Sequence, residues 1–214
     1  MIQCVVFDFD GTLILSNQIK ENTFFSVTKN IPHSNQILKQ LLKDPKLNNR
    51  KIIFYELSFL LKKIYNFDCD PNFLIEKYTN ICEKLVTKAP EMAGASNTLV
   101  NLKNQGFKIA ISSATPQPTL KKILKNRGME SFFDYIYGAP MSKDDHLKNL
   151  SSFIPCALSQ LILVGDSEID QKAAKNVGSH FIGIGHNYDR FIDRPKYLLE
   201  DLTNFSSALK KLTG

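Results

Sequence analysis

The sequence contains no apolar run of the length needed to cross a membrane, so an integral membrane protein is not expected. Its first residues lack the basic start, long apolar stretch and small-residue cleavage site of a secretory signal, and we expect a cytoplasmic protein. The four cysteines are widely scattered, without the close pairs typical of zinc sites or redox motifs. They are most simply explained as small buried residues in a reducing compartment.

Positive charge is in excess but is not concentrated. The formal net charge is +6, yet the lysines are spread over expected helices and form no basic stripe interleaved with aromatic residues. We therefore expect no nucleic-acid partner, and a lysine-rich surface in contact with water explains the charge. The 214 residues are 43% hydrophobic and 22% charged and show no internal repeat, which indicates one full core or a core with a smaller insert.

A helical insert is predicted between about residues 16 and 87, because apolar residues recur there at spacings of three and four. Turn residues break this pattern at three places, near Ile31-Pro32, Asp44-Pro45 and Asp68 to Pro71. We expect a bundle of helices in this region. Residues 1–15 and 88–214 then form a separate core that the insert interrupts.

Short apolar segments and helical patterns alternate outside the insert. The expected strands are 2–7, 107–112, 133–137, 161–164 and 181–184. This alternation predicts a doubly wound α/β core of three layers, in which helices cover both faces of a parallel sheet. Ligands of such sheets bind at the carboxyl ends of the strands, so the residues that follow each strand are the candidates for a functional site.

Two carboxylates, Asp8 and Asp10, follow the first expected strand, with Gly11 next in the chain. Side chains alternate along a strand, so Asp8 and Asp10 point the same way. A buried charge without a partner is costly, which implies a cation or a ligand at this point. An ordinary polar turn explains the segment equally well when it is considered alone.

Polar residues also follow the later strands. The hydroxyls in 112–115 can hold an anion or cap the next helix, and Lys143 comes just after the third strand. Asp166 and Asp170 lie one helical turn apart, so they either face one site or form an acidic first turn. Taken together, these strand ends indicate a magnesium site beside a phosphate pocket.

The motifs and their order resemble those of haloacid dehalogenase superfamily phosphatases. The residues that carry the resemblance are Asp8-x-Asp10-Gly11-Thr12, Ser113, Lys143 and Gly165-Asp166-x-x-x-Asp170. The helical insert is similar to the cap of the subgroup that includes phosphoglycolate phosphatases and β-phosphoglucomutases. The resemblance implies a magnesium-dependent hydrolase of a small phosphorylated metabolite, 2-phosphoglycolate or a sugar phosphate, with the cap selecting the substrate.

The resemblance also implies roles for the acidic residues. Asp8 would attack phosphorus and form an aspartyl phosphate, and Asp10 would protonate the leaving oxygen and then activate water. The Mg²⁺ ion would be held by Asp8, by the backbone carbonyl of Asp10 and by Asp166, with Asp170 either a direct ligand or a partner of the groups that bind the ion. The nucleophilic role of Asp8 and the acid role of Asp10 require the environment to keep Asp8 ionised and Asp10 protonated.

The phosphoryl oxygens would be held by Ser113, the backbone amide of Ala114 and Lys143. The choice of Ser113 over Ser112 or Thr115 rests on the resemblance, because strand alternation alone allows another choice.

Within the cap, Asn17, Lys20 and Glu21 follow the first motif, and Arg50 precedes an apolar helix. We expect these residues to be candidates for contact with the substrate, although each is also explained as a helix residue in water.

Other activities are open or less favoured. A β-phosphoglucomutase-like phosphotransferase shares the whole core, and a non-catalytic phosphate-binding or regulatory protein could keep the fold. Dehalogenation is disfavoured because halide-removing relatives lack an acid at the position of Asp10. A nicotinamide site is disfavoured because Gly183-Ile184-Gly185 lacks a third glycine. We expect a monomer or a homodimer.

Overall fold

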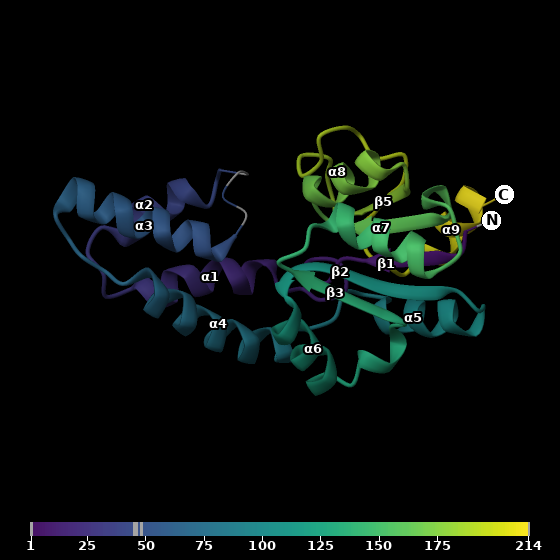
Figure 1. The fold of residues 1–214 in the computed structure, drawn as a ribbon, viewed down its shortest axis with the longest axis horizontal. Coiled ribbons are helices and arrows are strands. Elements are labelled where there is room, and N and C mark those ends of the chain that lie inside the picture. The colour runs from purple at the N-terminus through teal and green to yellow at the C-terminus, as the bar shows by residue number, and fades with distance from the viewer. Residues whose placement is uncertain (1, 45–46, 48, 214) are drawn as a thin grey trace. The chain divides into compact units, whose positions relative to one another are not determined.

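The computed structural model describes residues 2–44, 47 and 49–213. The chain divides into two compact units, one formed by the residues up to Leu15 and from Ala89 onward, and the other by Ser16–Lys88 (Figure 1). We refer to them as the core unit and the helical unit.

A six-stranded sheet forms the centre of the core unit, with the strand order β3-β2-β1-β4-β5-β6 and every pair of neighbours parallel. Its strands are β1 (Cys4–Phe7), β2 (Lys108–Pro116), β3 (Tyr135–Ala139), β4 (Leu161–Gly165), β5 (His180–Ile184) and β6 (Leu198–Leu199). The chain moves from β1 through β2 to β3 and then returns across the sheet to β4, β5 and β6. The predicted doubly wound parallel sheet is therefore confirmed.

Helices cover both faces of this sheet, with α5 and α6 on one side and α7 and α8 on the other (Figure 1). The helices of the core unit are α5 (Ala95–Asn104), α6 (Gln117–Asn126), α7 (Lys143–Phe153), α8 (Glu168–Val177) and α9 (Phe205–Thr213). Successive side chains of β1 point to opposite faces of the sheet. Cys4 and Val6 are buried in one cluster with Leu147 of α7, whereas Phe7 packs against Phe205 of α9. Burial on both faces explains why β1 is apolar throughout.

The second strand differs from the expectation that it ends at residue 112. It continues to Pro116, with a register shift against β3 between Ser112 and Pro116. Residues 112–115, three of which carry a hydroxyl, therefore lie within an irregular strand and not in a turn after it. The short β6 has no counterpart among the expected strands, because two residues give no readable alternation.

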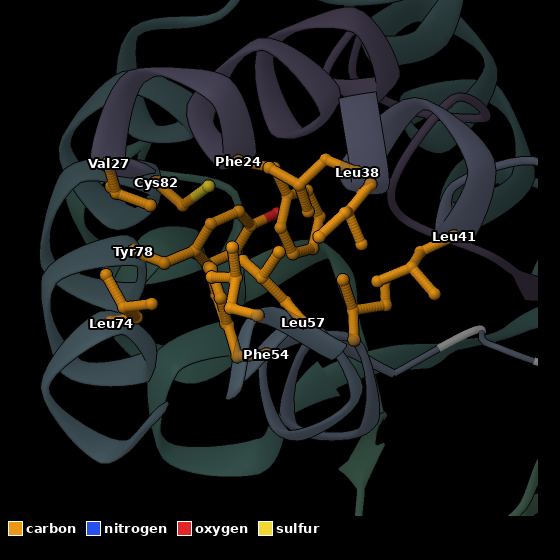
Figure 2. Close-up of a cluster of buried hydrophobic side chains, with 12 residues drawn as sticks. Phe24, Val27, Leu38, Leu41, Phe54, Leu57, Leu74, Tyr78 and Cys82 are labelled. Atoms are coloured by element: carbon orange, nitrogen blue, oxygen red, sulfur yellow. The ribbon is translucent and has the colours of Figure 1, made fainter. Parts of the chain in front are cut away.

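The helical unit consists of α1 (Asn17–Thr28), α2 (Ser34–Leu41), α3 (Arg50–Tyr65) and α4 (Pro71–Lys88). Its core contains the rings of Phe24, Phe54 and Tyr78, whose centroids lie 4.3–5.7 Å apart (Figure 2). Asn49 caps the start of α3, since its side chain accepts a hydrogen bond from the backbone of Lys51.

Of the expected breaks between helices, that at Asp44-Pro45 falls partly on Pro45, which lies outside the described residues. In the described part of the chain, none of the helices has the length and apolar character required to span a bilayer.

Candidate active site

Asp8 and Asp166 are brought together by the pairing of the two central strands. Phe7 pairs with Val164 in the parallel ladder, and the backbone N–H of Asp8 continues it by donating to the carbonyl of Val164 at 2.8 Å. Both strands end here, and each is followed directly by an aspartate, Asp8 after Phe7 and Asp166 after Gly165. The acidic residues thus share the carboxyl edge of the sheet, where the order of the strands reverses.

A cluster of three buried carboxylates results, because Asp170 in the first turn of α8 joins Asp8 and Asp166. One oxygen from each lies within 4.8 Å of the others. Gly165 makes this approach possible: a Cβ atom at this position would overlap the side chain of Asp170. The donors are all carboxylate oxygens, a set that fits Mg²⁺ and does not favour softer metals.

Lys143 is the buried cation of the cluster. Its Nζ lies 2.8 Å from Asp8 Oδ1 and 2.5 Å from Asp170 Oδ1, and the residue is only 8% exposed. Ser142 fixes the start of α7 by accepting a hydrogen bond from the backbone of Asp145. Burial opposes the charged form, but the two carboxylates outweigh it and raise the pKa of Lys143, so the ammonium stays charged.

The negative charge of the cluster exceeds what Lys143 balances. Burial raises the pKa of Asp8 to about 8, since Lys143 offsets only part of this effect and the carboxylates of Asp170 and Asp166 add to it. A divalent cation at this point would favour the ionised form of Asp8. The residues present therefore fit a magnesium site in charge as well as in donor type.

Arg190 is a further cation that the sequence analysis missed. Its Nη1 lies 2.7 Å from Asp166 Oδ2, and its side chain is 50% exposed. It comes from the segment after β5, which Gln171 anchors: the Gln171 Oε1 atom accepts from the backbone of Ile192 at 2.9 Å, and its Nε2 donates to the carbonyl of Asp193 at 2.7 Å. Neither strand nor helix periodicity marks this segment, so no sequence pattern indicated the arginine.

The side chain of Asp10 is not one of the three clustered carboxylates and bonds to a different strand. Its Oδ2 accepts a hydrogen bond of 2.9 Å from Thr115 Oγ1 on the neighbouring strand β2. The chain turns away directly after it, with Gly11 in a left-handed conformation (φ 79°) and the Gly11 N–H donating to the carbonyl of Ile14 at 2.8 Å. A side chain at position 11 would be strained, which explains the glycine.

The three hydroxyl groups at the end of β2 have different partners. Ser112 Oγ lies 2.8 Å from Nδ1 of His146, Ser113 Oγ accepts from the backbone N–H of Thr115 at 3.0 Å, and Thr115 bonds to Asp10 as described. The exposed Ala114 lies between the buried Ser113 and Thr115. The three hydroxyls thus differ in their hydrogen-bond partners, and the assignment of Ser113 to the phosphoryl group stays a prediction.

His146 is the other residue that sequence reasoning missed. It lies fully buried on α7, close to one helical turn after Lys143, with its ring stacked on Tyr137 at 5.2 Å. Burial lowers the pKa of His146 to about 4, so the imidazole is neutral near pH 7. Through Ser112 it connects α7 to the end of β2.

The candidates for substrate contact belong to the helical unit: α1 carries Asn17, Lys20 and Glu21, and Arg50 lies at the start of α3. Arg50 is engaged within that unit, because its Nη1 donates to Thr79 Oγ1 at 3.1 Å and its guanidinium lies 5.5 Å from the centroid of the Tyr78 ring.

Comparison with known proteins extends these findings. Residues 5–184 match the family described as haloacid dehalogenase-like hydrolase. Pyrophosphatase PpaX of Bacillus mycoides is 25% identical over 231 residues, which cover 100% of this chain and 99% of the relative. Phosphoglycolate phosphatase of Colwellia psychrerythraea is 25% identical over 230 residues, covering 98% and 97%.

A crystal structure of a protein from Haemophilus somnus, described as a predicted phosphoglycolate phosphatase, has a TM-score of 0.80 with 21% identity over 97% of this chain and 98% of its own. At this identity the likeness shows a shared fold.

Proposed function

The chain belongs to the haloacid dehalogenase-like hydrolase family and is one of its phosphatases, and we propose that it hydrolyses a small phosphomonoester in a magnesium-dependent reaction through a phosphorylated Asp8. The observation that carries this proposal is the convergence of Asp8, Asp166 and Asp170 on one buried point, with Lys143 between Asp8 and Asp170. Three carboxylates and an ammonium in this arrangement serve no packing purpose, since burying them is costly.

In the first half of the reaction, an Asp8 oxygen forms a bond to phosphorus while the ester P–O bond breaks. The leaving oxygen takes its proton from Asp10, which follows the nucleophile by two residues and is held by Thr115 Oγ1. The Lys143 ammonium, 2.8 Å from Asp8 Oδ1, favours the ionised nucleophile and attracts the phosphoryl oxygens. This half leaves the phosphoryl group on Asp8 and releases the alcohol.

In the second half, Asp10 takes a proton from a water molecule, and the water oxygen forms a new bond to phosphorus as the bond to Asp8 breaks. Inorganic phosphate leaves, and both aspartates return to their starting states. Splitting one displacement into two steps is the general advantage of a covalent intermediate.

Asp8, Asp166 and Asp170, with the backbone carbonyl of Asp10, would hold the Mg²⁺ ion. When bound, the cation supplies charge that offsets the repulsion between the anionic nucleophile and the anionic phosphate. Ser113, the backbone amide of Ala114 and Lys143 are the groups we assign to the phosphoryl oxygens.

For the substrate we propose 2-phosphoglycolate or a sugar phosphate, and for the helical unit, residues 16–87, the role of a cap that selects it through Asn17, Lys20 and Arg50. A relative named phosphoglycolate phosphatase supports the first choice, and a relative named pyrophosphatase adds inorganic pyrophosphate to the compounds that need testing.

The test is a comparison of kcat/KM over 2-phosphoglycolate, sugar phosphates, nucleotides and pyrophosphate, with Mg²⁺ and with EDTA. We expect turnover that requires the metal and that Asp8→Asn abolishes. A matched control is Asp68→Asn, which removes a carboxylate whose side chain is 79% exposed and should leave the rates unchanged. Absence of metal-dependent turnover on all these compounds would contradict the proposal.

A further inference from the structure

Thr115 makes a contact that none of the roles above explains. Its hydroxyl donates to Asp10 Oδ2 at 2.9 Å, across the boundary between β2 and the segment after β1. The residue is only 4% exposed, and its backbone N–H is fixed by Ser113 Oγ at 3.0 Å. A buried hydroxyl in the irregular part of β2 therefore holds one oxygen of the candidate acid and base.

We propose that Thr115 is a positioning residue, which holds the carboxyl group of Asp10 in one orientation through both halves of the reaction. The inference rests on the proposed function and deepens it. A carboxyl group that must give a proton to one oxygen and later take a proton from another has to stay within hydrogen-bond reach of both. Fixing Oδ2 restricts rotation of the group, so that less freedom is lost in each transition state.

The contact has a chemical consequence that a purely structural role lacks. A sugar or alkyl phosphate leaves as a basic alkoxide and needs the proton of Asp10. An aryl phosphate such as p-nitrophenyl phosphate leaves as a stable phenolate and needs it far less. The ratio kcat/KM covers steps up to phosphorylation of Asp8, whereas kcat also includes hydrolysis of the phosphorylated enzyme, which uses Asp10 with every substrate.

The experiment measures kcat/KM and kcat on a sugar phosphate and on p-nitrophenyl phosphate for the full chain with Mg²⁺. Thr115→Val keeps the β-branch and the approximate shape of the side chain and replaces the hydroxyl by a methyl group. We expect kcat/KM for the sugar phosphate to fall by about tenfold or more, kcat/KM for the aryl phosphate to stay nearly unchanged, and kcat for the aryl phosphate to fall.

Two further variants complete the design. Thr115→Ser keeps a hydroxyl and should restore the sugar phosphate rate, and Thr119→Val, on α6 just after β2, removes a hydroxyl outside the site and should have no effect. If Thr115→Val does not fold, as judged by its thermal unfolding midpoint, Thr115→Ala carries the same comparison.

Suppose that the wild type is active and that Thr115→Val loses kcat/KM equally on both substrates, or on neither. Either result would overturn the assignment of Thr115 alone. A wild-type protein without metal-dependent turnover on these two substrates and on every compound of the panel above would overturn the proposed function, and the role of Thr115 with it.

Discussion

Replacing Lys143 by methionine tests the energetics of the site most sharply. Methionine has a similar length and fills the space, but it removes the charge that lies 2.8 Å from Asp8 and 2.5 Å from Asp170. Breaking a buried ion pair by deleting one partner costs about 3–5 kcal/mol, because the remaining charge has no compensation. An ion pair in water contributes only about 0–1 kcal/mol. The size of the decrease in the free energy of unfolding therefore distinguishes a buried network from a surface contact.

The buried carboxylate can escape part of this cost by taking up a proton. The pKa of Asp8 is already about 8 with Lys143 present, and losing the ammonium raises it further. At low pH the variant should thus approach the stability of the wild type. The difference should grow as the pH rises toward and above 8, because the folded variant keeps a proton on Asp8 at pH values where the folded wild type and the unfolded chains have released it.

The assay is urea denaturation in EDTA at several pH values between about 5 and 9, a range that spans the pKa of about 8 of Asp8 in the folded wild type. Lys148→Met provides the control, since Lys148 lies on the same helix in an exposed pair 3.9 Å from Asp145. The reasoning would be refuted if, at pH 8 or above, Lys143→Met lowered the free energy of unfolding by no more than the control does, about 1 kcal/mol or less.

The remaining predictions concern the metal site, the pH dependence and the helical unit. Gly165→Ala should displace Asp170 and weaken Mg²⁺ binding about tenfold or more, measured by calorimetric titration. The Asp8 carboxyl, whose pKa is raised from 3.8 to about 8, should make the metal-free protein lose stability as the pH rises across that interval, and denaturation with saturating Mg²⁺ should show a shallower slope. Phe54→Ala should cost about 3–5 kcal/mol in urea denaturation, because Phe54 is fully buried against Phe24 and Tyr78.

The fold could be predicted from the sequence because its signals are local. Apolar runs that alternate with amphipathic segments define the parallel sheet, and Gly11 and Gly165 mark the places where the backbone turns or a side chain approaches. The convergence of Asp8 with Asp166 follows from the rule that strand ends share one edge.

Contacts that depend on tertiary packing could not be predicted. Arg190 reaches Asp166 from an irregular segment that Gln171 holds through its side chain, and no periodicity reports such an anchor. The hydroxyls of β2 looked interchangeable in the sequence, because both the register shift in this strand and the contact of Thr115 with Asp10 arise only when the strands pair. The roles of the catalytic and cap residues stay predictions until they are tested.

The central claim is that Asp8 carries the phosphoryl group. It is tested most directly by mixing the protein with Mg²⁺ and a substrate from the panel, quenching in acid within the first turnovers, and measuring peptide masses. We predict that the peptide containing Asp8 gains the mass of one phosphoryl group, with fragmentation assigning it to that residue and no gain in Asp8→Asn. Turnover without any phosphorylated peptide, or with the label on another residue, would contradict the account.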